Sequence, residues 1–319
     1  MSELSEVFRS LFVETRQYRR FMEFCDDCRR RRYIGLCYGP PGVGKTLSAR
    51  HYSRADVVHT YCNRLRANKT NPSFMELRAI MGHDIVFYTA AVVNSPGKID
   101  TDISRLRDNL LSLIRQDISM RSEEKRNELR RLEEKEHDKW LHAEDWFCTK
   151  KPDHAEREYL QACMEYSAEY ANAKDPTRLI IIDEADRLKM AGLEQLRAIF
   201  DGGGIGLILI GMPGMEKRLS RYPQLYSRVG FVHEFQVLAE KETRHLLENR
   251  WCPSGVTLPP TAFTDEEGLA AILRITGGNF RLLDRLLTQI ARVLEINRLD
   301  RVTASVVDVA RESLVIGTV

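Results

Sequence analysis

The residues of this chain with the clearest capacity for chemistry form a glycine-rich loop at residues 39–46. The loop reads GPPGVGKT, which matches the phosphate-binding pattern G-x-x-x-x-G-K-[ST] at every defined position. Glycines let backbone N–H groups surround a phosphate chain, Lys45 can reach the β- and γ-phosphates, and Thr46 offers a hydroxyl to Mg²⁺. We therefore predict a Mg·ATP site formed by Gly39, Pro40, Pro41, Gly42, Val43, Gly44, Lys45, Thr46 and Leu47.

The segments on either side of this loop have the character that a phosphate site requires. Residues 33–38, YIGLCY, form a short apolar run that is typical of a buried strand. Residues 46–53 are predicted to form a helix, whose positive dipole end would face the phosphates. The agreement of strand, loop and helix makes a chance glycine turn a poor alternative.

A second pair of reactive groups follows the all-aliphatic run LIII at residues 179–182. Asp183 and Glu184 come directly after this run, at the end of a predicted strand. We expect Asp183 to hold Mg²⁺ together with Thr46, and Glu184 to act as the general base that polarises the attacking water. The predicted reaction is the conversion of ATP and water to ADP and phosphate. The alternative is an ordinary acidic strand end before a helix.

The rest of the chain supplies the elements that must position these groups. Continuous apolar runs alternate with helical stretches, a pattern that predicts an α/β fold with a parallel sheet covered by helices on both faces. Further strands are expected at residues 84–93, 206–210 and 232–237, and helices at 100–118, 154–173 and 192–200. Residues 55–83 read as polar and irregular, and the charged stretch 121–145 as a solvated helix or helical hairpin. From residue 239 onward the pattern is helical.

Composition sets wider limits on the class of protein. Hydrophobic residues make up 43% and charged residues 29% of 319, values typical of a globular protein and not of a disordered one. The sequence contains no apolar run of about 18 residues and no secretory signal at its start, so we expect a cytoplasmic protein without a membrane partner. The net charge of +2 does not demand nucleic acid as a ligand. Cys25 and Cys28, a C-x-x-C pair, are interpreted as reduced thiols on a helix.

These motifs together resemble those of the AAA+ ATPases. Residues 183–188, DEADRL, resemble the Walker B box, and residues 206–214 resemble the sensor-1 strand and its turn. Residues 223–229 resemble the stretch that ends in an arginine finger, and residues 277–281, GGNFR, resemble the sensor-2 box. The resemblance covers roughly residues 20–315. It implies an AAA+ domain at 1–237, with insertions at about 55–83 and 119–175, and a small all-helical lid domain at 238–319.

The resemblance also implies catalytic roles for two arginines. Arg228 would be a finger that stabilises charge on the γ-phosphate bound by a neighbouring subunit, with Arg221 as the runner-up. Arg281 would contact the bound nucleotide and so couple nucleotide binding to the lid. An ordinary salt bridge is the alternative for each. The sensor-1 position departs from the family, because Gly211 and Met212 replace its usual polar residue. That departure implies slow, switch-like hydrolysis.

Within the AAA+ proteins, residues 193–229 resemble the DNA-transposition regulators of the TniB, TnsC, MuB and IstB type. The resemblance implies a homo-oligomer, as a ring or a helical filament, that binds double-stranded DNA with ATP and recruits or activates a transposase. One alternative is an AAA+ ATPase of a defence, signalling or secretion system without direct DNA binding. Another is an initiator or clamp-loader-like protein. We expect this alternative less, because initiators usually append a winged-helix domain and this sequence ends soon after the expected lid, at Val319.

Three basic groups are candidates for contacts with DNA phosphates. The first follows the second predicted strand and consists of Lys98, Arg105 and Arg107. The second consists of Arg64, Arg66 and Lys69, and the third of Arg29, Arg30, Arg31 and Arg32. A solvated basic face is the alternative for the first two groups. For the third, the alternatives are a surface helix end and a contact with DNA or another subunit.

Overall fold

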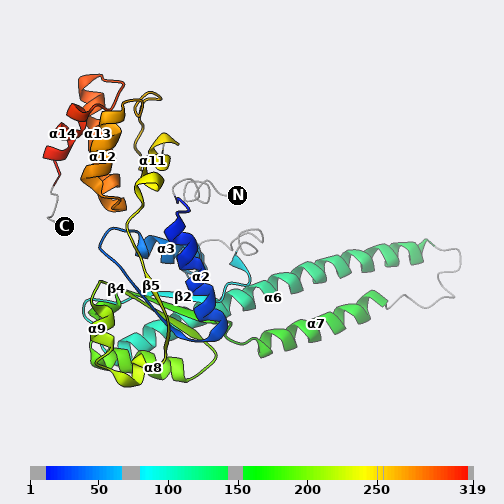
Figure 1. Ribbon diagram of the computed structural model, residues 1–319. Coiled ribbons are helices and arrows are strands. Elements are labelled where there is room, and N and C mark those ends of the chain that lie inside the picture. Colours follow the sequence, from blue (N-terminus) through cyan, green and yellow to red (C-terminus); the bar gives the residue numbers. More distant parts are fainter. Residues whose placement is uncertain (1–11, 67–79, 143–153, 250, 254, 315–319) are drawn as a thin grey trace. The chain divides into compact units, whose positions relative to one another are not determined.

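A five-stranded parallel sheet carries the fold of this chain (Figure 1). The computed structural model describes residues 12–66, 80–142, 154–249, 251–253 and 255–314. The strand order is β2-β3-β4-β1-β5. The strands are β1 (Ile34–Tyr38), β2 (Ile85–Thr89), β3 (Leu179–Asp183), β4 (Gly206–Gly211) and β5 (Val229–Glu234). This architecture confirms the predicted α/β class with a parallel sheet.

The central strands are buried because their side chains are apolar on both faces. All residues of β3 and β4 are buried, and Leu207 of β4 pairs with both Ile34 of β1 and Ile180 of β3. The carboxyl ends of β1 and β3 therefore lie at one edge of the sheet, which brings the glycine loop and Asp183 to the same edge.

The edge strand β5 differs from its predicted position at residues 232–237. It begins at Val229, which pairs with Ile34 of β1. Glycine at position 230 is required by packing, because a Cβ atom there would lie 2.6 Å from the Tyr33 ring. Gly230 interrupts the apolar run, so the apolar pattern alone placed the strand too late in the chain.

Helix α2 (Arg16–Arg31) packs closely on the sheet (Figure 1). Its N-cap is Thr15, whose hydroxyl accepts a hydrogen bond from the N–H of Tyr18. Two glycines allow the close approach, since Cβ atoms on Gly35 and Gly206 would each come within 2.5 Å of Cys28. Cys28 and Cys25 are both buried, and burial raises the pKa of the Cys28 thiol to about 12. Both cysteines lie on this helix, as predicted.

The middle of the chain differs from expectation in two ways. Residues predicted as irregular include helix α4 (Ala55–Arg66), in which Tyr61 and Cys62 are buried on one face. The expected helix at 100–118 and the charged stretch after it form one 46-residue helix, α6 (Pro96–Leu141). No glycine or proline occurs between residues 98 and 141, so nothing in the sequence forces a break. Residues 67–79 and 143–153 of the predicted insertions lie outside the described residues.

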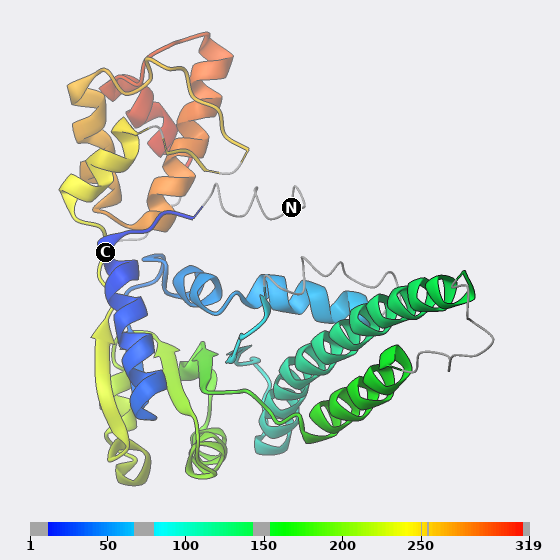
Figure 2. The ribbon, with the colours of Figure 1, turned by 90° about the vertical axis from the view of Figure 1, so that its right-hand side faces the viewer.

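Helix α7 (His154–Asn172) runs beside α6 (Figures 1 and 2). Arg121 on α6 lies 2.8 Å from Asp117 and 2.6 Å from Glu169 of α7. The described residues within 56–86 and 101–177 form one compact unit, and the other described residues form a second. The charges of the stretch predicted to be solvated therefore include ion pairs that join the two helices.

The C-terminal region is helical, as predicted. It contains α11 (Glu240–Glu248), α12 (Glu266–Thr276), α13 (Phe280–Asn297) and α14 (Ala304–Glu312). These helices enclose their own apolar core, which includes Leu247, Ile272, Leu287 and Val307. The exact division into domains at 1–237 and 238–319 stays a prediction. Among the described residues, no helix has the length and apolar character that crossing a membrane requires.

Candidate nucleotide-binding site

The glycine loop connects β1 to α3 (Lys45–Tyr52). Gly42 and Gly44 have φ angles of 82° and 102°, in the left-handed region that favours glycine. The Lys45 Nζ atom donates hydrogen bonds to the backbone carbonyls of Gly39 at 2.6 Å and Pro40 at 2.8 Å. Burial lowers the pKa of Lys45. The ammonium is therefore held over the loop, where phosphate oxygens could replace the two carbonyls as its acceptors.

Asp183 and Thr46 lie together at the carboxyl edge of the sheet. Asp183 is 3% exposed, and its carboxylate accepts hydrogen bonds from the Thr46 hydroxyl and from the Glu184 N–H, the latter at 3.0 Å. Burial raises the pKa of Asp183, while these hydrogen bonds oppose the rise. A buried carboxylate beside a hydroxyl is a hard oxygen donor set that suits Mg²⁺. The residues fit the predicted metal role.

Glu184 is held in a conformation that residues other than glycine seldom adopt, with φ 56° and ψ 37°. Its side chain is 40% exposed, and its carboxylate lies 3.6 Å from the Arg187 guanidinium. Arg187 also donates a hydrogen bond to the carbonyl of Ala90, just beyond β2, at 3.0 Å. The predicted general base is thus joined to the segment after β2. The sequence signalled Glu184 by its place after Asp183 but gave no sign of the link through Arg187.

The turn after β4 contains the predicted sensor-1 position, Gly211 and Met212. A side chain at residue 211 would be crowded, because its Cβ atom would lie 2.9 Å from the Asp186 carboxylate and closer still to Met215. The N–H of Met212 donates to that carboxylate at 3.2 Å. Arg218 donates to the carbonyls of Asp186, at 2.6 Å, and Leu188. These contacts join the turn after β4 to the segment that follows Asp183 and Glu184. The close packing explains why residue 211 is a glycine.

The first turn of α13 contacts the phosphate-binding loop. The side-chain amide of Asn279 donates to the carbonyl of Pro41 at 2.9 Å, and the N–H of Arg281 donates to the carbonyl of Gly42 at 3.0 Å. The Asn279 side-chain oxygen caps α13 by accepting from the N–H groups of Arg281 and Leu282. The Arg281 side chain itself is exposed. Asn279, which we had not predicted as a site residue, therefore links α13 to the loop.

We expect Asn279→Ala to destabilise the protein by about 1 kcal/mol through loss of the helix cap, and to weaken ATP binding through loss of the Pro41 contact. Asn279→Asp is the matched control, because aspartate keeps the capping oxygen but cannot donate to Pro41. Thermal unfolding and binding of a fluorescent ATP analogue separate the two effects. Near-normal stability with weakened ATP binding is expected for Asn279→Asp. Equal ATP affinity in all three proteins would contradict a role for this contact.

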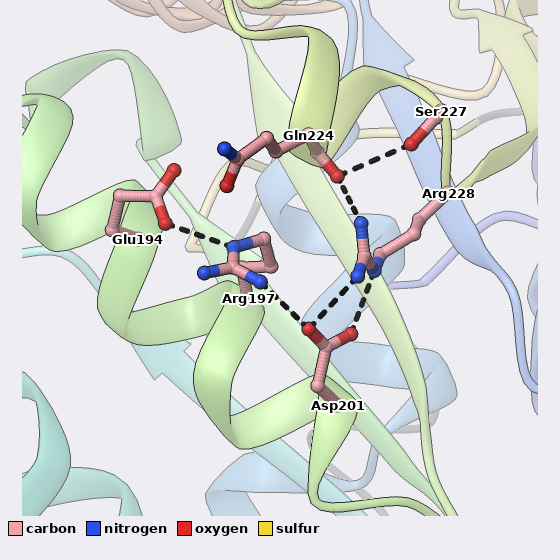
Figure 3. A network of polar contacts seen from close by, with 6 residues as sticks. All are labelled: Glu194, Arg197, Asp201, Gln224, Ser227 and Arg228. Atoms are coloured by element: carbon pink, nitrogen blue, oxygen red, sulfur yellow. Dashed lines mark hydrogen bonds and ion pairs between the residues drawn. The ribbon is translucent and has the colours of Figure 1, made fainter.

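Arg228 lies away from the loop of its own chain. Its carbonyl accepts a hydrogen bond from the N–H of Ile34, so it stands at the amino edge of β1 and β5. The guanidinium pairs with Asp201 of α8 (Met190–Asp201), with Nε at 2.7 Å and Nη2 at 3.0 Å (Figure 3). Arg221, the alternative finger, is exposed. The structure thus brings together the loop, the two carboxylates and the start of α13, but not Arg228.

Some of the basic residues predicted to contact DNA form ion pairs, and others are placed by their helices. Arg105 pairs with Asp102 at 3.2 Å, and Arg107 pairs with Asp175 at 2.5 Å. Lys98 lies in the first turn of α6. In the other groups, Arg64 lies on α4, Arg29, Arg30 and Arg31 form the last turn of α2, and Arg32 is its C-cap. The Arg66 side chain and Lys69 lie outside the described residues.

Comparison with known proteins agrees with this geometry. The family model of the AAA domain matches residues 28–219. A potential ATP-binding protein of Staphylococcus aureus is 41% identical over 310 residues, which cover 96% of this chain and 97% of that protein. The Mu-like prophage FluMu DNA transposition protein B of Haemophilus influenzae is 33% identical over 114 residues, which cover 33% of this chain and 36% of that protein.

Two solved structures share the fold at low sequence identity. The ORC2 protein of Aeropyrum pernix gives a TM-score of 0.53 at 14% identity, covering 98% of this chain and 72% of that one. A mutant of Thermotoga maritima RuvB gives 0.50 at 17% identity, covering 96% and 72%. The family match and the relative that covers nearly the whole chain show that this chain belongs to the AAA family of P-loop ATPases.

Proposed function

We propose that this ATPase is an ATP-dependent, DNA-binding regulator of transposition. In this proposal it forms a homo-oligomer on double-stranded DNA and recruits or activates a transposase at target sites. The observation that carries the proposal is the likeness of about a third of the chain to a prophage DNA transposition protein. The resemblance of residues 193–229 to transposition regulators supports the same function.

The proposed nucleotide chemistry follows from the positions of the site residues. Lys45 binds the β- and γ-phosphates, while Thr46 and Asp183 hold Mg²⁺, which supplies charge neutralisation on the phosphates when bound. Glu184 takes a proton from the attacking water. Gly211 offers no side chain to the γ-phosphate, which supports slow turnover. Slow turnover suits a switch that stays on DNA while ATP is intact.

The proposed DNA contacts must come from local groups, because the chain as a whole is nearly neutral. Arg105 and Arg107 have carboxylate partners, but the Arg105 side chain is 59% exposed. Exposed ion pairs contribute only about 0–1 kcal/mol, so DNA phosphates could replace the carboxylate at low cost. Lys98, Arg105 and Arg107 are the proposed phosphate contacts. The exchange of partners applies to Arg105, because the Arg107 side chain is only 35% exposed.

We expect the chain to bind duplex DNA at least about 10-fold more tightly with a non-hydrolysable ATP analogue than without nucleotide, a coupling within the usual range for two linked sites. Fluorescence anisotropy at two salt concentrations measures this. The affinity should fall as salt rises, because phosphate contacts release counterions. Absent or nucleotide-independent DNA binding would contradict the proposal and favour an AAA+ ATPase of a defence, signalling or secretion system.

A further inference from the structure

The Arg228 guanidinium is fixed in its own chain by contacts on two of its sides (Figure 3). Nε and Nη2 donate to the two oxygens of Asp201, and Nη1 donates to the carbonyl of Gln224, in the preceding helix α10 (Pro223–Tyr226). A guanidinium has five N–H donors in one plane. The contacts among the described residues engage three of these donors. Two further N–H groups, one on each Nη, are left for a ligand, and the side chain is 33% exposed.

Asp201 occupies a position that its own helix does not favour. It is the last residue of α8, where the negative end of the helix dipole disfavours a carboxylate. Two arginines offset this cost, since Arg197 of the same helix lies 2.8 Å from the Asp201 carboxylate and Arg228 approaches from the other side. Arg197 is paired in turn with Glu194 at 2.8 Å. Arg228 is therefore held in one orientation by Asp201 at the end of α8 and by the carbonyl of Gln224.

The position of this group excludes a role at the phosphate site of the same chain. Arg228 directly precedes β5 at the amino edge of the sheet, whereas the glycine loop follows the carboxyl end of β1. The five residues of β1 alone span about 16 Å at the usual rise per residue. An arginine side chain cannot cover that distance along a strand. If Arg228 contacts the γ-phosphate of a nucleotide, that nucleotide must therefore be bound by another copy of the chain.

We propose that Asp201 is a positioning residue for catalysis by a neighbouring subunit. It holds the Arg228 guanidinium so that its remaining N–H groups meet the γ-phosphate bound by the next copy. This inference rests on the homo-oligomer of the proposed function and deepens it. A fixed guanidinium loses less conformational entropy when it contacts the transition state, so its orientation raises the rate of hydrolysis and not the affinity for ATP.

The first test is the steady-state kinetics of Asp201→Asn under the conditions in which the wild-type protein assembles. We expect kcat to fall by about 10- to 100-fold, the cost of a misplaced catalytic group, with little change in KM. Asp201→Glu keeps the charge and moves the carboxylate by one methylene, so an intermediate loss is expected. The control is Glu267→Gln, which removes an exposed carboxylate from the first turn of α12, outside this network, and should leave kcat unchanged. An increase in kcat for Asp201→Asn would overturn the proposal, because it would show that Asp201 restrains Arg228 from acting.

The second test mixes subunits. Glu184→Gln subunits have an inactive site but an intact Arg228 and Asp201, so an excess of them should place a functional arginine beside each Asp201→Asn site. The hydrolysis rate per Asp201→Asn chain should then come within about twofold of the rate per wild-type chain mixed with the same excess of Glu184→Gln subunits. A neighbouring subunit can repair only a defect in a group that acts on the next subunit's site. Binding of a fluorescent ADP analogue checks that the variant is folded.

An Arg228→Ala mixture distinguishes failure of this inference from failure of the proposed assembly. If Glu184→Gln restores Arg228→Ala but not Asp201→Asn, the arginine acts between subunits and Asp201 does not position it. If neither variant is restored, Arg228 does not act between subunits, and the premise that this inference takes from the proposed homo-oligomer fails as well. Restoration of both variants is the expected result.

Discussion

Lys45→Ala is expected to slow ATP hydrolysis strongly and to weaken ATP binding by about 10- to 100-fold, the value of a hydrogen bond to a charged group. In the structure the Lys45 ammonium donates hydrogen bonds to the carbonyls of Gly39 and Pro40 in the loop. Its removal leaves the β- and γ-phosphates without their nearest cation from the loop, and the charge that builds up during hydrolysis loses its main stabilising group. The expected loss of hydrolysis is at least about 100-fold.

Two further variants define what the lysine contributes. Lys45→Arg keeps the charge but has a planar, larger head group, so we expect weak binding and little hydrolysis. Lys241→Ala removes an exposed lysine from α11 and should behave as wild type. Calorimetric titration with a non-hydrolysable ATP analogue, with phosphate release measured in parallel, checks these results. Wild-type ATP affinity in Lys45→Ala would show that the loop is not the nucleotide site.

Glu184→Gln is expected to bind ATP normally and to hydrolyse it about 100- to 10,000-fold more slowly, the usual contribution of a general base. Glutamine keeps the size of the side chain and cannot accept a proton from water. Asp183 and Thr46, which are expected to hold Mg²⁺, are unchanged, so the affinity for ATP should persist. The Glu184→Gln protein should also remain on DNA longer than wild type in the presence of ATP.

The measurement is single-turnover hydrolysis of labelled ATP, combined with the lifetime of the protein on fluorescent duplex DNA. Glu267→Gln serves as the control, because Glu267 is an exposed glutamate in the first turn of α12. Hydrolysis at the original rate in Glu184→Gln would show that another group activates the water.

The sequence was sufficient to predict the phosphate-binding loop and the sheet that supports it. Residues 39–46 match a motif whose chemistry tolerates little variation, and the aliphatic runs of β1, β3 and β4 are typical of strands that are buried on both faces. Asp183 and Glu184 were found because they stand at the end of such a run. Each of these features is local, so neighbouring residues alone carry the signal.

Features that depend on contacts between distant segments were missed. Asn279 contacts Pro41 across 238 residues of sequence, and Arg187 joins Glu184 to Ala90 across 97. Arg228 was expected at a subunit interface, but its pairing with Asp201 could not be read from the pattern of either segment. The start of β5 depends on its pairing with β1, which outweighs the interruption of the apolar run at Gly230. Tertiary packing selected these arrangements among several that the local sequence allowed.

The most direct test of the account measures nucleotide affinity with and without DNA. If the AAA site is the nucleotide end of a DNA-binding switch, the factor by which ATP tightens DNA binding must equal the factor by which DNA tightens ATP binding. Titration of Glu184→Gln with a fluorescent ATP analogue, with and without saturating duplex DNA, should show a gain in affinity of about 10-fold or more that matches the gain in DNA affinity. Equal nucleotide affinity with and without bound DNA would contradict the account.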